Sequence, residues 1–95
     1  MPYIKQKDRN RVDALIDSIA ERIAKDSNDN GEQVCGRLNY TITKLMQKVL
    51  EYENIRIGYS EYNELIGMLE CCKLELYRRK VAPYEDAKIK ENGDV

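Results

Sequence analysis

The sequence contains no histidine, no tryptophan and no phenylalanine among its 95 residues. Without histidine, a serine or cysteine nucleophile has no imidazole base, and the commonest general acid–base catalyst is missing. The glycine-rich phosphate-binding motifs GxxxxGK(S/T) and GxGxxG are also absent. Because the sequence offers no set of nucleophile, base and orienting group, we expect that the protein is not an enzyme.

Cysteine chemistry is equally limited, because the three cysteines are an odd number and include the adjacent pair Cys71 and Cys72. Adjacent residues on a helix point about 100° apart, so a disulfide between these two has poor geometry. With no histidine and no CxxC spacing, the sequence predicts no zinc site and no cofactor.

No apolar run in the sequence is long enough to cross a membrane, and no signal peptide is recognisable. Together with the odd number of cysteines, these features predict a soluble protein of a reducing cytoplasm with no membrane partner.

The charges are nearly balanced, with 16 basic and 17 acidic residues, which argues against a general binder of duplex DNA. They are unevenly placed, however. Residues 1–11 carry a net charge of +3 and residues 73–90 also carry +3, whereas residues 12–72 carry −5. If the two basic ends meet, within one chain or across subunits, they create a local positive field on a nearly neutral protein.

Apolar residues recur at helical spacing in three long segments, so we predict an all-α protein. A single domain of residues 1–95 would hold three main helices and a short C-terminal one. The predicted helices run roughly over residues 9–26, 33–53, 60–81 and 83–91.

The expected helix ends follow from turn and cap residues. Asp8 or Asn10 can cap the first helix, and the stretch SNDNG at residues 27–31 is expected to stop it. Ser60 can cap the third helix. That helix is expected to end before Pro83, because a residue that precedes proline is pushed away from α-helical geometry.

Self-association is expected for two reasons. A chain of this size buries only about 60–65% of its extended surface as a monomer, so docking onto further copies would add stability. The seven tyrosines are the only aromatic residues, and tyrosine is common at interfaces and in ligand pockets. We therefore predict a homo-oligomer.

Arg78, Arg79, Tyr84 and Lys88 form the first candidate site, around Pro83. Basic residues in the last turn of a helix favourably meet the negative end of its dipole, which would explain the arginines without any ligand. As a functional alternative, arginine can pair with a phosphate through two hydrogen bonds and tyrosine can stack on a base. A rigid corner at Pro83 would hold such an anion pocket.

Asn39, Tyr40 and Thr43 form the second candidate site, on the predicted second helix. Asn39, Thr43 and Gln47 are four residues apart and share a helix face, with Tyr40 beside them. These polar groups could be a solvated face, a helix–helix contact or a recognition strip for a nucleobase. Lys5, from the basic N-terminus, could close the site from another subunit.

Three stretches carry a resemblance to a known group of proteins: MPYIKQKDR, LNYTITKL and LECCKLELYRRKVAPYEDAKIKENGDV. They resemble a family of small, functionally uncharacterised proteins found in phages and prophages. The resemblance implies a phage context, and the host cytoplasm as the location. Small helical phage proteins include sponges that sequester cyclic oligonucleotides or ADP-ribose-type messengers of host immunity. The similarity to those sponges lies in size, helical class and cytosolic character.

Two functions remain open at this point. The first is a non-enzymatic protein that sequesters a nucleotide-derived immune signal in pockets of a homo-oligomer. The second is a helical adaptor or inhibitor that binds a host or phage protein and takes no small ligand. In the oligomer, arginines at the base of a concave pocket would favour the first function, and arginines on a convex face would favour the second.

Overall fold

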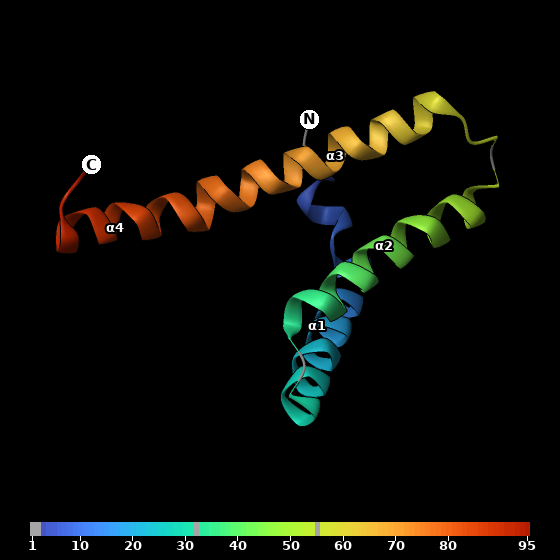
Figure 1. Cartoon of the computed structure of the whole chain (residues 1–95). Coiled ribbons are helices and arrows are strands. Elements are labelled where there is room, and N and C mark those ends of the chain that lie inside the picture. Colours follow the sequence, from blue (N-terminus) through green and yellow to red (C-terminus); the bar gives the residue numbers. More distant parts are fainter. Residues whose placement is uncertain (1–2, 32, 55) are drawn as a thin grey trace. The chain divides into compact units, whose positions relative to one another are not determined.

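The computed structural model describes residues 3–31, 33–54 and 56–95, and these residues form helices and no strands. The predicted all-α class is therefore confirmed. The chain divides into two compact units, residues 1–55 and residues 56–95. In chain order the elements are η1 (Gln6–Asp8), α1 (Asn10–Asn30), α2 (Val34–Glu53), α3 (Tyr59–Leu76), η2 (Tyr77–Val81) and α4 (Ala82–Asn92) (Figure 1).

The first unit begins with a short 3-10 turn, η1, that leads directly into α1. The residue before α1 is Arg9, whose carbonyl accepts hydrogen bonds from the backbone N–H groups of Val12 (3.0 Å) and Asp13 (2.9 Å). No side chain caps this helix end, so the predicted cap by Asp8 or Asn10 is wrong. The entering chain is held instead by the Arg9 Nε, which donates to the carbonyl of Ile4 at 3.1 Å.

The end of α1 lies at Asn30, within the SNDNG stretch predicted to stop it but beyond the predicted helix end at residue 26. The Ser27 hydroxyl donates to the carbonyl of Ile23 at 2.7 Å, and the Asn30 amide donates to the carbonyl of Asp26 at 2.8 Å. These side chains bond one turn back along the helix, so residues that often open turns extend the helix here. Gly31, with a φ of 65°, then ends it in a left-handed conformation.

The second helix of this unit matches its predicted range closely; it ends at Glu53 and is followed by Asn54 in a left-handed conformation, with a φ of 52°. Helices α1 and α2 meet near the turn that joins them. There the Asp26 Oδ2 lies 3.9 Å from the Arg37 Nη1. Ser27, which is 3% exposed, is the one buried residue in the described part of the chain.

The second unit is one continuous helix built from α3, η2 and α4 (Figure 1). The predicted break before Pro83 is wrong, since Ala82 has helical angles of φ −60° and ψ −47°. The segment η2 is a π-helical turn, in which the Ala82 N–H donates to the carbonyl of Tyr77, five residues earlier. Regular α-helical bonding at the next position would require an N–H that proline lacks. The wider π turn changes the bonding step just before that position, and the helix continues.

The start of α3 is set by Gly58 and Glu61. The Gly58 N–H donates to the Glu61 carboxylate at 2.8 Å, an arrangement that satisfies a backbone donor at the helix start. Ser60 lies inside the first turn of the helix, so the predicted cap at Ser60 is wrong.

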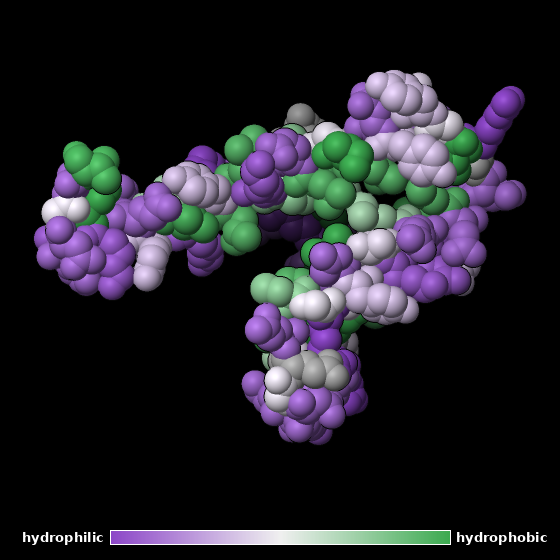
Figure 2. Space-filling model, in the orientation of Figure 1, coloured by the Kyte–Doolittle hydropathy of each residue, from purple (hydrophilic) through white to green (hydrophobic). Residues whose placement is uncertain are grey.

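Neither unit has an apolar core of its own within the described residues. No described hydrophobic side chain is buried, and many large ones are more than 40% exposed. Figure 2 shows hydrophobic residues, in green, at the surface over the continuous helix of the second unit. Each unit therefore presents apolar surface that its own elements do not cover.

Candidate functional site

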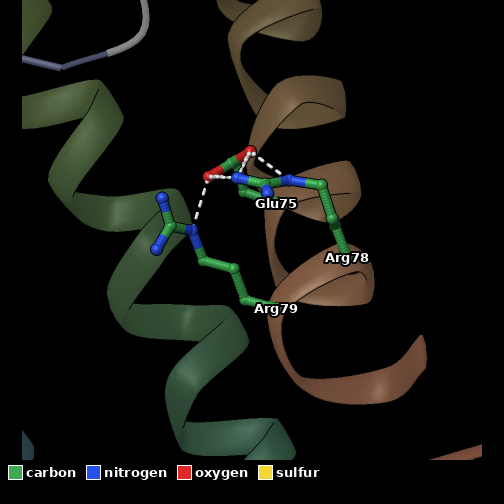
Figure 3. Close-up of polar contacts among 3 residues, drawn as sticks. All are labelled: Glu75, Arg78 and Arg79. Atoms are coloured by element: carbon green, nitrogen blue, oxygen red, sulfur yellow. Dashed lines mark hydrogen bonds and ion pairs between the residues drawn. The ribbon is translucent and has the colours of Figure 1, made fainter. Parts of the chain in front are cut away.

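The two arginines of the predicted pair share one neighbouring carboxylate (Figure 3). The Arg79 Nε lies 2.8 Å from one oxygen of Glu75, and the Arg78 Nη2 lies 3.1 Å from the other. The arginine side chains are 66% (Arg78) and 58% (Arg79) exposed, on the convex surface of a helix. A phosphate at this place would have to compete with Glu75, and the helix itself provides no concave wall.

Tyr84 and Lys88 lie one turn apart, as predicted, but not at a corner. The Lys88 ammonium lies 5.6 Å from the centroid of the Tyr84 ring, a cation–π contact, and also 3.0 Å from Glu91. The structure thus brings these two side chains together and ties the lysine to its own helix. The rigid corner that was to position them beside the arginines is not formed, because the helix runs through Pro83.

The predicted polar residues of α2 are only partly suited to recognition. The Thr43 hydroxyl donates to the Asn39 side-chain oxygen at 3.3 Å, so these two groups satisfy each other on one helix face. Tyr40 is separate from them and is 67% exposed. Lys5 precedes η1. All four residues belong to the first unit, whereas the arginine cluster belongs to the second.

A groove lies between the two helices of the first unit, α1 and α2, and Tyr40 is one of the residues that line it. Its volume is about 680 Å³, within the range of small-molecule sites. A smaller hollow of about 300 Å³ shares Tyr40 and continues along α2. We call the two together the basic groove, defined by its charged and aromatic residues Arg22, Asp26, Arg37, Tyr40, Lys44 and Lys48.

The lining of the basic groove is strongly positive. Four basic residues and one acidic residue give the lining a net charge of +3, inside a segment whose own net charge is −5. On α2 the members Arg37, Tyr40, Lys44 and Lys48 follow one another at steps of three and four residues. That spacing places them in one row on a single helix face.

Ion pairs hold basic residues at both ends of the groove. Asp26 lies 3.5 Å from the Arg22 guanidinium and 3.9 Å from that of Arg37, so one carboxylate orients two arginines from different helices. Lys48 pairs with Glu51 at 3.3 Å. In the described part of the chain, Lys44 has no acidic partner. The positive field is therefore least compensated beside Tyr40, in the middle of the row.

Sequence reasoning identified Tyr40 but missed the four basic residues around it. The signal was present in the steps from Arg37 to Tyr40, Lys44 and Lys48. It was hidden because residues 12–72 are acidic as a whole, and because Arg22 reaches the row from another helix.

The family model of a domain of unknown function, DUF6899, matches residues 1–95. The chain belongs to the DUF6899 family. The match extends over both compact units, so the basic groove and the continuous helix are parts of one family domain. Among curated proteins and among solved structures, no match to this chain was found.

Two further observations bear on the site. Within residues 3–31, 33–54 and 56–95, no three His, Cys, Asp or Glu side chains are grouped so as to hold a metal ion. None of the helices in these ranges combines the length and the apolar character that a membrane span requires.

Proposed function

We propose that this chain is a non-enzymatic binding protein that holds a nucleotide-type anion in the basic groove. The observation that carries the proposal is the position of Tyr40. Its exposed ring stands between Arg37 and Lys44 on one helix face, above a groove of about 680 Å³ that also contains Arg22. Aromatic rings interleaved with basic side chains suit a ligand that has both flat bases and phosphates.

Each part of the groove has a distinct role in this proposal. Arg22 and Arg37 offer planar forks for phosphate oxygens, and Asp26 orients both before the ligand arrives. Lys44 supplies a point charge, and Tyr40 supplies a stacking surface worth about 1–3 kcal/mol per base. Binding of this kind needs no nucleophile or general base, in keeping with a sequence that has no histidine.

The spread of the cations favours a ligand with more than one phosphate. Arg37 and Lys48 are separated by eleven residues of α2, which corresponds to roughly 16 Å along the helix axis. A mononucleotide would engage only part of such a row. A cyclic oligonucleotide or an ADP-ribose-type compound would reach several of the cations. The most specific form of the proposal is therefore sequestration of an immune signal of one of these types by a phage-type homo-oligomer.

The test is a thermal-shift and calorimetric screen against cyclic di- and trinucleotides, ADP-ribose derivatives and ordinary nucleotides. A ligand at a hundredfold excess over its Kd stabilises the native state by about 2.7 kcal/mol, several degrees for a small domain. Tyr40→Ala is expected to weaken binding at least tenfold, while Tyr40→Phe keeps the ring and binds normally. No shift with any compound of the panel would refute the proposal.

A matched pair of charge variants locates the site. Arg37→Gln with Lys44→Gln removes two cations from the groove, and Arg11→Gln with Lys25→Gln removes two cations of the same unit outside it. Only the first pair is expected to abolish binding. Loss of binding in Arg79→Ala, with the groove variants unaffected, would place the ligand instead at the cluster of Arg78, Arg79, Tyr84 and Lys88.

The second candidate function is the adaptor or inhibitor that binds a host or phage protein. The exposed apolar side chains of both units favour it, since large uncovered apolar surfaces commonly mark interaction sites. In that case the groove variants would leave the activity of the protein unchanged, and substitutions on an apolar helix face would abolish it.

A further inference from the structure

The continuous helix of the second unit has an apolar stripe that runs from Tyr62 to Tyr84. Its three parts, α3, η2 and α4, contain 18, 5 and 11 residues, which gives a helix of 34 residues. From Tyr62 to Leu76, one set of apolar positions follows at steps of three and four residues, which is the spacing of one helix face. The next member of this set is Val81, after a step of five residues. We call these positions the helix stripe: Tyr62, Leu65, Leu69, Cys72, Leu76, Val81 and Tyr84.

The step of five coincides with the π turn. In a π turn the hydrogen bonds join residues five apart, as shown by the bond from the Ala82 N–H to the Tyr77 carbonyl. Residues five apart therefore lie above one another there, as residues four apart do in an α-helix. Val81 consequently follows Leu76 on the same face. In an uninterrupted α-helix, Lys80 would take that place and Val81 would be turned away.

Nothing within the second unit covers the helix stripe, because that unit contains this one helix and no second packing element. Tyr62, Leu76 and Tyr84 are each more than half exposed. The helix spans about 51 Å, and pairing over that whole length would bury about 1,000 Å² in total, the lower limit for specific interfaces. The stripe from Tyr62 to Tyr84 is about 33 Å long and supplies about two-thirds of that area. The charged residues beyond Tyr84 therefore also belong to the contact with a partner helix.

The charges along the helix indicate which partner fits. Residues 59–75 carry a net charge of −3 and residues 76–92 carry +2. A partner in parallel with the same charge order would bring like charges together. A second copy that runs in the opposite direction brings the acidic half of each helix against the basic half of the other, and such complementarity fixes orientation and register. We infer that a second copy of this chain packs antiparallel on the helix stripe, with the two-fold axis near Leu76.

Two leucines of the same helix provide a matched test of the interface. Leu76 lies on the stripe and is 61% exposed, whereas Leu74 lies on the opposite side of the helix and is 56% exposed. Analytical ultracentrifugation of the full chain is expected to show a dimer or a multiple of it. Leu76→Glu should raise the dissociation constant at least tenfold, and Leu74→Glu, which introduces the same charge, should leave it within about twofold.

The direction of pairing is tested by disulfide formation between copies. The natural cysteines Cys35, Cys71 and Cys72 are all exposed and are first replaced by serine. One sample of this background then carries Leu65→Cys and another carries Lys88→Cys. Antiparallel pairing about Leu76 places these two positions opposite each other, so oxidation of the mixture should give mainly the mixed dimer.

Three results would overturn the inference. A wild-type chain that stays monomeric at high concentration would show that the stripe binds its own first unit or a different protein. Equal effects of Leu74→Glu and Leu76→Glu would place the interface elsewhere. Oxidation that gives mainly the two like-with-like dimers would establish parallel pairing. Ligand titration of Leu76→Glu separates these outcomes from the proposed function, because the basic groove lies in the other unit and its residues are unchanged.

Discussion

The Tyr77 hydroxyl donates a hydrogen bond to the Glu85 carboxylate, 2.9 Å away, across the π turn. These residues are eight positions apart, and the bond joins the first residue of η2 to the first turn of α4. The pair therefore ties the start of the π-helical segment to the α-helix that follows it.

The first prediction concerns the titration of Tyr77. The hydrogen bond to Glu85 and the negative charge of that carboxylate raise the pKa of Tyr77 above its ordinary value of 10.0. Glu85→Gln should lower this pKa toward the ordinary value, measured from the ultraviolet absorbance of tyrosinate during an alkaline titration. Tyr77→Phe should remove one step from this titration curve, and the missing step is the one that belongs to Tyr77. If Glu85→Gln leaves the pKa of Tyr77 unchanged, the hydrogen bond between Tyr77 and Glu85 does not form in solution.

The same bond predicts how stability depends on pH. Because the folded-state pKa of Tyr77 is raised, the stabilisation from this group is fully present below pH 10 and is lost as the pH rises through the raised pKa. Helical content measured by circular dichroism should fall over this alkaline range, and less so in Tyr77→Phe. An equal loss in both proteins would assign the alkaline transition to other groups.

The second prediction compares two glycines. No atom lies within 4 Å of a Cβ added to Gly67, which is inside α3, so Gly67→Ala should stabilise the protein by about 1 kcal/mol through helix propensity. Gly31 has equally open space but a φ of 65°. Gly31→Ala should therefore destabilise the protein by about 1–2 kcal/mol. Urea denaturation at one protein concentration measures both changes, and the same sign for both would contradict this account.

The third prediction concerns the carboxylate of Glu75, which forms ion pairs with both Arg78 and Arg79. Glu75→Gln removes the charge that Arg78 and Arg79 share, and it should change the free energy of unfolding by less than about 1 kcal/mol because the pairs are at the surface. If the arginine cluster is an anion site, the change should strengthen nucleotide binding in a Tyr40→Ala background. Isothermal titration calorimetry that detects no binding by this double variant would rule out an anion site at the cluster.

The helices were predictable because their apolar spacing is regular, and α2 in particular lies almost where the sequence places it. The errors lie where a local signal has two outcomes. Ser27 can open a turn or bond back to the helix, and here it bonds to the carbonyl of Ile23. Proline usually ends a helix, but the π turn before Pro83 lets the helix continue. Propensity alone does not distinguish these outcomes.

The candidate site was less predictable than the fold. Tyr40 was identified because it stands beside a polar row, whereas Asn39 and Thr43 bond to each other and do not line the groove. Arg22 joins the site only because the turn after α1 brings two helices together at Asp26. A contact between distant parts of the sequence has no spacing signature, so a single sequence cannot reveal it.

The uncovered apolar surface of both units has a consequence for the amount of protein that a cell must make. Where other copies provide the cover, the free energy of unfolding depends on the concentration of the chain. A few copies would remain poorly folded and exposed to proteases, and more copies would fold and persist. The amount of folded, active protein would then rise steeply once the rate of synthesis passes a threshold, even if each folded subunit binds its ligand independently.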